Sequence, residues 1–134
     1  MIMATYGMSI KIIGTLEEVK PRVLEALKEQ GFGVLTEIDV QKTLKQKIDV
    51  DFKPYQILGA CNPRFAYRAL SADDSIGLLL PCNVVLMQES DGVVVSIQDP
   101  EVMFSVVDEK TKASMPGFPQ EVKRSLLSAL DALK

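Results

Sequence analysis

The spacing of apolar residues along the chain predicts strands that alternate with helices. Apolar residues at every second position are typical of a strand, and apolar residues at every third or fourth position are typical of a helix with one buried face. Strands are predicted over residues 2–14, 32–38, 55–60, 82–89 and 92–98. Helices are predicted from residue 15 to a C-cap at 31, over 40–48, from 63, over 101–107, and from 119 onward. The order β-α-β-α-β-α-β-β-α predicts an α+β fold, a two-layer α/β arrangement with helices packed on a mixed five-stranded sheet.

Local signals support several of these boundaries. Thr15 and Glu18 have the spacing of a capping box. Asn62 followed by Pro63 is typical of a helix start, because Asn caps well and Pro suits the first helical position. An Asp-Gly pair at 91–92 predicts a tight hairpin. Pro21 leaves two alternatives for the first helix, which either kinks there or becomes regular only near residue 20.

Four finer expectations concern burial and strand direction. Apolar residues on both faces of 32–38 predict a central strand. The helix at 40–48 is expected to bury Val40, Leu44 and Ile48, and the polar segment 108–115 is expected to be an exposed loop. Right-handed crossovers would make the early strands partly parallel.

Composition narrows the function classes. The chain has 134 residues, which predicts a single domain over 1–134, and a formal charge of −3. Without an extended basic patch, nucleic acid is not an expected partner. Histidine is absent from the sequence, which excludes Ser-His-Asp and Cys-His catalysis within the chain and any histidine-based metal site.

The location is expected to be cytoplasmic, with reduced thiols. The N-terminal residues lack the pattern of a signal peptide. The longest apolar run, 76–87, is interrupted by Pro81 and Asn83 and is too short to span a membrane. No membrane partner is therefore expected.

Three segments together resemble one family. They are residues 31–39 (GFGVLTEID), 57–63 (ILGACNP) and 77–85 (GLLLPCNVV). Their order closely resembles the domain of unknown function 302 family over nearly the whole chain. The resemblance implies a small two-layer α/β domain that pairs as a homodimer, and it implies no reaction. The residues that match the family pattern are Glu37, Asp39, Cys61, Asn62, Pro63, Cys82 and Asn83.

The two cysteines are the candidate catalytic residues. Cys61 precedes a predicted helix start, where the helix dipole can lower the pKa of a thiol and make it nucleophilic. A buried structural role is the simpler alternative, because free cysteine is among the most buried residue types. Cys82 lies near Cys61 only if the two strands are antiparallel, and it would then be a resolving thiol. Two thiols are too few ligands to predict a metal, and no cofactor is expected.

Polar residues around the thiols are the candidate ligand-binding residues. Asn62, Pro63 and Asn83 either cap and shape the backbone or face a shared pocket. Glu37 and Asp39 fall on one side of a strand end, where they could form an acid/base pair or a cation site. Capping of the next helix by Asp39 is the favoured alternative.

The leading hypothesis is a homodimeric module that binds a small anionic ligand at the Cys61–Asn62 helix start. The alternative is a thiol-dependent redox or transfer enzyme, with Cys61 as nucleophile and Cys82 as resolving thiol. A third hypothesis is a purely structural subunit. The sequence leaves open whether any reaction is catalysed.

Overall fold

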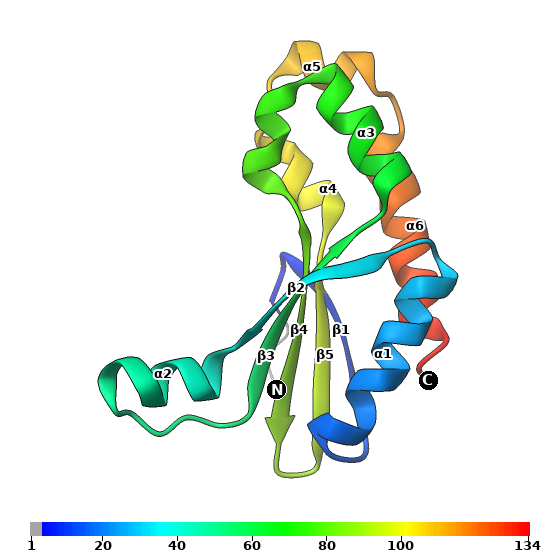
Figure 1. Ribbon diagram of the computed structural model, residues 1–134. Helices are drawn as coiled ribbons and strands as arrows, with labels where there is room; N and C mark the ends of the chain where they lie inside the picture. Colours follow the sequence, from blue (N-terminus) through cyan, green and yellow to red (C-terminus); the bar gives the residue numbers. More distant parts are fainter. Residues whose placement is uncertain (1–3) are drawn as a thin grey trace.

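The protein is a five-stranded sheet with helices along one side and across one end (Figure 1). The computed structural model describes residues 4–134, so the first two residues of the strand predicted over 2–14 lie outside the described part. The strands are β1 (Gly7–Ile12), β2 (Gly33–Asp39), β3 (Tyr55–Cys61), β4 (Cys82–Glu89) and β5 (Gly92–Gln98). The helices are α1 (Leu16–Glu29), α2 (Val40–Ile48), α3 (Pro63–Ala72), α4 (Pro100–Met103), α5 (Glu109–Ser114) and α6 (Phe118–Asp131), with 3₁₀ turns η1 (Asp74–Leu79) and η2 (Phe104–Val106).

The sheet order is β1-β5-β4-β3-β2, and each neighbouring pair in the described chain is antiparallel. The α+β fold with five strands is confirmed. The expectation of partly parallel early strands is wrong, because β1 and β2 lie at opposite edges of the sheet. The segment that contains α2 returns the chain antiparallel to β2, so it acts as a long hairpin connection and makes no crossover.

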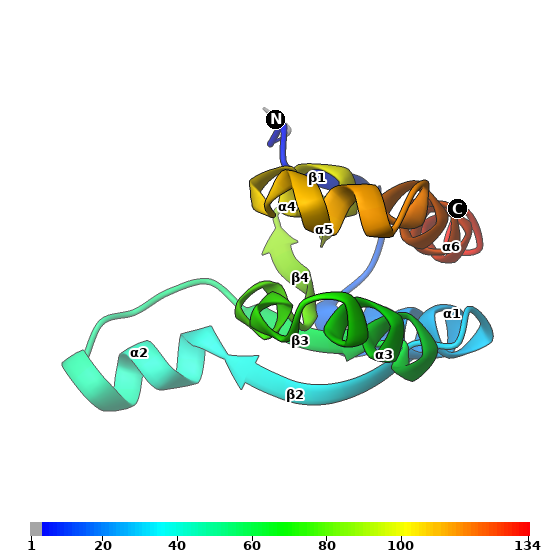
Figure 2. The same ribbon diagram turned by 90° about the horizontal axis from the view of Figure 1, so that it is seen from above.

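The hydrophobic core lies between one face of the sheet and the helices α1 and α6. Alternate residues of the central strands are fully buried on this face, among them Leu58, Val84 and Leu86. Val23 and Leu126 from the two helices pack into the same cluster. Figures 1 and 2 both show α1 and α6 on one side of the sheet. This side of the sheet is its helix-covered face, and the opposite side is its open face.

Local capping follows the sequence closely. Thr15 and Glu18 form the predicted capping box, and α1 runs on from Leu16 with Pro21 inside it. The helix is therefore already regular before Pro21. The predicted β4–β5 hairpin is present, with Glu89 paired to Gly92 across the turn.

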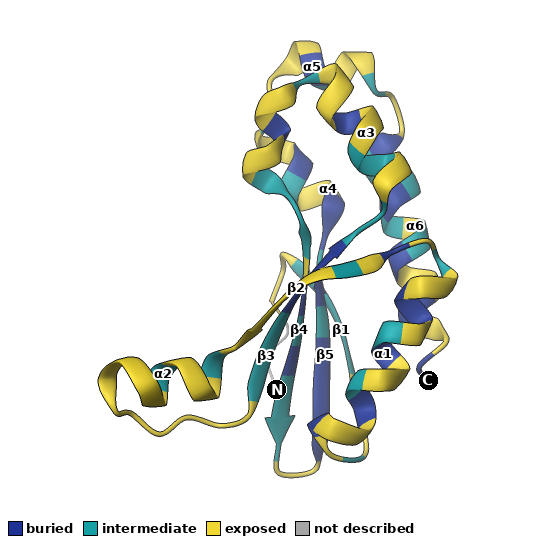
Figure 3. Ribbon diagram, viewed as in Figure 1, coloured by how far each residue is buried: buried dark blue, intermediate teal, exposed yellow. Residues whose placement is uncertain are grey.

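The strand β2 lies at the edge of the sheet, so the prediction of a central strand is wrong. A β-bulge between Val34 and Thr36 disturbs the register there. Leu35, between them, is 69% exposed. The residues of α2 are also all exposed or half-buried, against the expectation of a buried side (Figure 3). Their apolar residues have no core to reach, because α2 projects from the sheet on the side away from α1 and α6 (Figures 1 and 2).

The segment 108–115 contains the helix α5, so the expectation of a loop is wrong, while most of its residues are exposed as predicted. Asp108 caps this helix by accepting a bond from the Thr111 amide at 2.8 Å. Thr111 is buried, and its hydroxyl donates to Asp73 at 3.3 Å. A polar segment can therefore fold against the body of the protein when its few inward groups find partners.

Within residues 4–134, the helices are too short or too polar for any of them to cross a membrane.

Candidate functional site

The two thiols come together at one end of the sheet. Because β3 and β4 are antiparallel, Cys82 lies directly opposite Ala60, the neighbour of Cys61. The sequence predicted that the two cysteines lie near each other if their strands are antiparallel, and β3 and β4 are antiparallel. Both cysteines are free and half-buried.

The thiols line a small apolar cavity of about 30 Å³. Its walls include the rings of Phe32, Phe65, Phe104 and Phe118. A single water molecule occupies about 30 Å³ in the liquid, so the cavity is too small for a ligand of several atoms. The surroundings of the thiols are therefore those of a packed core.

The pKa of each thiol is raised. Burial raises the pKa of Cys61 above its usual value of 9.0. Burial, and then the neighbouring Cys61, raise the pKa of Cys82 to about 11, while a hydrogen bond with Gln98 opposes the shift. Both shifts run opposite to those of an activated nucleophile, because only the thiolate is nucleophilic. Both thiols are accordingly protonated at neutral pH.

Asn62 uses its side chain to cap α3. Its Oδ1 accepts bonds from the amides of Arg64 at 3.1 Å and Phe65 at 3.4 Å. Its Nδ2 donates to the carbonyl of Gln30 at 3.3 Å, which ties the end of α1 to the start of α3. Pro63 occupies the first turn, as predicted. The amides that would hold an anion at this helix start are thus already bonded to Asn62.

The other predicted ligand-binding residues lie elsewhere. Asn83 is exposed and pairs with Gly59 on the open face. Glu37 forms an ion pair with Lys20 of α1. Asp39 caps α2 by accepting a bond from the Lys42 amide at 2.9 Å, which is the favoured alternative from the sequence. The structure therefore brings Cys61, Asn62 and Cys82 together, and it leaves Asn83, Glu37 and Asp39 apart from them.

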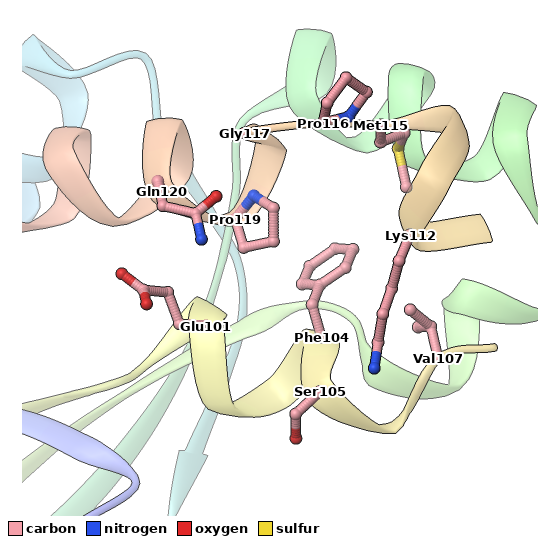
Figure 4. Close-up of a pocket in the computed structure, with 10 residues that line it drawn as sticks. All are labelled: Glu101, Phe104, Ser105, Val107, Lys112, Met115, Pro116, Gly117, Pro119 and Gln120. Atoms are coloured by element: carbon pink, nitrogen blue, oxygen red, sulfur yellow. The ribbon is translucent and has the colours of Figure 1, made fainter. Parts of the chain in front are cut away.

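A larger pocket shares Phe104 with the thiol cavity. Figure 4 shows the residues that line it. It has a volume of about 280 Å³ and lies between α4, η2, the end of α5 and the start of α6. The Phe104 ring and Pro119 give it apolar walls, and the ammonium group of Lys112 and the carboxylate of Glu101 lie on different sides of it (Figure 4). Each charge has a partner, since Lys112 lies 3.2 Å from Glu109 and Glu101 lies 3.6 Å from Lys123.

Sequence reasoning missed this second pocket because two of its ten lining residues, Lys112 and Met115, fall in the segment that was expected to be a loop. The signal that could have found it is the dense run Met115-Pro116-Gly117-Phe118-Pro119. A left-handed Gly117 between two prolines bends the chain sharply before α6 and holds the pocket wall in place.

Among the described residues, there is also no group of three or more acidic or cysteine side chains placed to hold a metal ion.

The family described as Domain of unknown function DUF302 matches residues 8–133 of the chain. The chain belongs to the DUF302 family. A crystal structure of an uncharacterised conserved DUF302 protein from Bacillus stearothermophilus is similar over 98% of this chain and 100% of that one. The sequence identity is 28% and the TM-score is 0.84. A comparison with curated proteins gives no match.

Membership of the DUF302 family confirms the resemblance that the three sequence segments indicated. The similar structure extends over nearly the whole fold, including the sheet, the projecting α2 and the helices at the end of the sheet. The family is defined without an assigned activity, so the function has to be argued from the geometry of this chain.

Proposed function

We propose that this DUF302 domain is a non-catalytic binding module that works as a homodimer and takes a small anionic ligand. The single observation that carries the proposal is the open face of the sheet, whose centre is apolar. A two-layer domain normally covers an apolar sheet face with helices or with a second sheet. In this chain, α1 and α6 cover the opposite face, and a second copy of the chain is the proposed cover for the open one.

The open face carries two adjacent rows of apolar side chains. In one row, Ile38, Ile57 and Val85 lie side by side on three neighbouring strands. In the next row, Tyr55 and Met87 lie side by side and are half-buried, and Val94 on the following strand is already buried within the single chain. These residues alternate with core residues along their strands, so they point away from α1 and α6. An apolar patch of this kind is typical of an interaction surface.

The projecting α2 segment adds to this surface. Ile48 is 63% exposed, and Val50 and Phe52 in the connection that follows are also exposed. The helix α2 lies on the same side of the sheet as the open face (Figure 2). In a two-fold symmetric dimer each copy contributes the same patch, so the α2 segment of each protomer would pack against the other protomer.

The mass of the protein in solution tests the dimer. Sedimentation equilibrium at micromolar concentration should give twice the chain mass of 14.8 kDa. A monomer of full stability over the same concentration range would overturn the proposal, because the exposed Ile38 and the half-buried residues of the two rows would then need no partner.

The pocket of Figure 4 is the proposed ligand site, in place of the amides that Asn62 already caps. It offers the Phe104 ring to an apolar body and the Lys112 ammonium to an anion. Its volume of about 280 Å³ suits a ligand smaller than a drug-sized molecule.

Benzoate is a suitable probe for this pocket. Its binding, followed by NMR titration, should weaken roughly tenfold in Lys112→Gln, because a charge-assisted bond contributes about 1.5–3 kcal/mol. Lys110→Gln on the same helix is the matched control, since Lys110 is exposed and lies outside the pocket. Equal loss in both variants would show attraction to the general charge of α5, and absence of benzoate binding would remove the ligand from the proposal.

The enzyme alternative has the neighbouring thiols in its favour and their raised pKa values against it. With a pKa of about 11, roughly one Cys82 side chain in a thousand is a thiolate at pH 8. The alkylation rate of Cys82, measured with iodoacetamide in Cys61→Ser, should rise with pH to a midpoint that burial still holds above 9.0 and that lies below 11, because the variant removes the contribution of Cys61. The raised pKa also means that the stabilising contribution of the neutral thiol is complete below pH 9 and is lost as the pH rises toward 11.

Cys82→Ser gives the corresponding measurement for Cys61. A Cys61 thiol that titrates below pH 7 in this variant would support the enzyme and contradict the binding module.

A further inference from the structure

The helix α2 and the connection that follows it, residues 40–53, form an arm that projects from the sheet (Figures 1 and 2). Within the described part of the chain, residues 4–134, no residue of the arm is buried. The apolar side of the helix consists of Val40, Leu44 and Ile48, and none of them belongs to the hydrophobic core. The single chain therefore leaves this apolar helix side uncovered.

Many polar contacts of the arm stay within the arm itself. Gln41 donates to the carbonyl of Phe52 at 2.9 Å. Lys45 pairs with Asp49 and with Asp51, both at 3.1 Å. These contacts shape the arm and do not attach it to the body of the chain.

The helix has little support from the body of its own chain. Lys53 pairs with Glu89 at 3.0 Å, but an ion pair on the surface contributes little stability. The helix has 9 residues. A helix of this length is marginal in water, because its first turn is costly to form and most helical stability in proteins comes from packing. A stable α2 therefore needs a surface to pack against.

The charge of the arm is opposite to the charge of the rest of the chain. The arm carries four lysines and two aspartates, which gives it a formal charge of +2. The chain as a whole has a formal charge of −3, so the residues outside the arm carry −5. A second copy of the chain therefore offers an acidic body to a basic arm, and such complementarity favours association.

The arm is also continuous with the proposed dimer surface. Ile38 of the open face immediately precedes Asp39, the N-cap of α2. Tyr55 of the same face follows the arm, and its ring lies 5.9 Å from the ring of Phe52. A second copy on the open face would thus lie beside both ends of the arm.

We propose that the arm folds when the dimer forms, so that α2 is helical only while its apolar side packs against the second copy. This inference rests on the proposed homodimer and adds that part of the fold depends on it. The monomer then consists of the folded sheet with α1 and α6, and of an unstructured arm. A segment that folds on binding loses its conformational freedom at that moment, which lowers the affinity that a given contact area provides.

Hydrogen exchange of the full chain tests the coupling, with sedimentation equilibrium assigning each sample as dimer or monomer. In the dimeric parent, the amides of residues 44–49 should exchange at least roughly 100-fold more slowly than in an unstructured peptide. Val85→Lys, which places a charge at the centre of the open face, supplies the monomer. There the same amides should exchange within about tenfold of the unstructured rate, while the amides of α6 stay protected.

A pair of arm variants tests the packing of the apolar side. Ile48→Glu should raise the dimer dissociation constant at least roughly tenfold, because it would bury a charge without a partner. Gln46→Glu is the matched control, since it adds the same charge to the opposite side of the same helix and Gln46 is exposed. The control should change the dissociation constant less than about threefold.

Three results would overturn the inference while the dimer stands. They are an unprotected arm in a dimeric parent, an arm that is equally protected in the monomer, and equal weakening by Ile48→Glu and Gln46→Glu. A monomeric parent would remove the proposed dimer and this inference together. A Val85→Lys protein that stays dimeric would place the two copies on another surface and remove the inference as well.

Discussion

Replacing Val85 by lysine should convert the dimer into a folded monomer. Val85 lies at the centre of the open face, between Ile57 and Ser96 on the neighbouring strands. In the proposed dimer the new ammonium group would be buried without a partner, which costs several kcal/mol. The dimer dissociation constant should rise roughly 100-fold or more, as for a substitution at the centre of an interface. Sedimentation equilibrium measures this change directly.

The stability of the monomer should change little in Val85→Lys. Its side chain points away from the core, and in a monomer the lysine reaches water freely. Val106→Lys is the matched control, because Val106 is 72% exposed and belongs to η2, away from the open face. The control should remain a dimer. A Val85→Lys protein that stays dimeric would show that the two copies meet through another surface.

Replacing Phe118 by alanine should remove about 3–5 kcal/mol from the free energy of unfolding. Phe118 is only 2% exposed and begins α6. Its ring meets Phe65 of α3 at 5.9 Å and Phe104 of η2 at 5.3 Å, both edge-on. The guanidinium carbon of Arg68 lies 5.0 Å from the centre of the same ring. One side chain therefore holds together the helices at the end of the sheet, and its loss leaves a cavity beside the thiols.

Denaturation in urea measures the effect of Phe118→Ala. Phe118→Leu is the control, because it fills most of the volume and lacks the edge-on and cation contacts of the ring. Leucine should cost clearly less than alanine, and the difference between the two variants reports the volume of the cavity. A loss below about 1 kcal/mol in Phe118→Ala would mean that the end helices can close over the gap, since the cost depends on how far a site collapses.

Local structure was predictable from the sequence where neighbouring residues satisfy one another. Thr15 with Glu18, and Asn62 with Pro63, mark helix starts because the partners of each cap lie within a few residues. The hairpin at Asp91-Gly92 has the same local origin. These features depend on short-range hydrogen bonds and backbone geometry, and distant parts of the chain cannot easily override them.

The position of β2 was not predictable in this way. Its apolar residues indicate that the strand is buried, and the sequence does not say whether the core of the same chain or a second chain buries it. Ile38 illustrates the difference, because it is 48% exposed in the single chain and belongs to the proposed dimer surface. The same reasoning explains α2, whose apolar side was expected to be buried and is exposed in the single chain.

The candidate site was predictable only in part. The Cys-Asn pairs marked the end of the sheet where the thiols meet. The direction of their pKa shifts depends on burial by Phe65, Phe104 and Phe118, which come from helices that the sequence could not place around the thiols.

The strand order has a consequence for how the chain folds as it is made. β1 is synthesised first and is an edge strand that pairs with β5, so Ser9 can bond to Ser96 only after 87 further residues have been made. The middle strands can pair with their neighbours as soon as they leave the ribosome, whereas β1 and the apolar side of α1 stay uncovered until β5 and α6 follow. The sheet edge formed by β1 is therefore completed last. The apolar residues of the N-terminal third become buried only when the C-terminal third has been made.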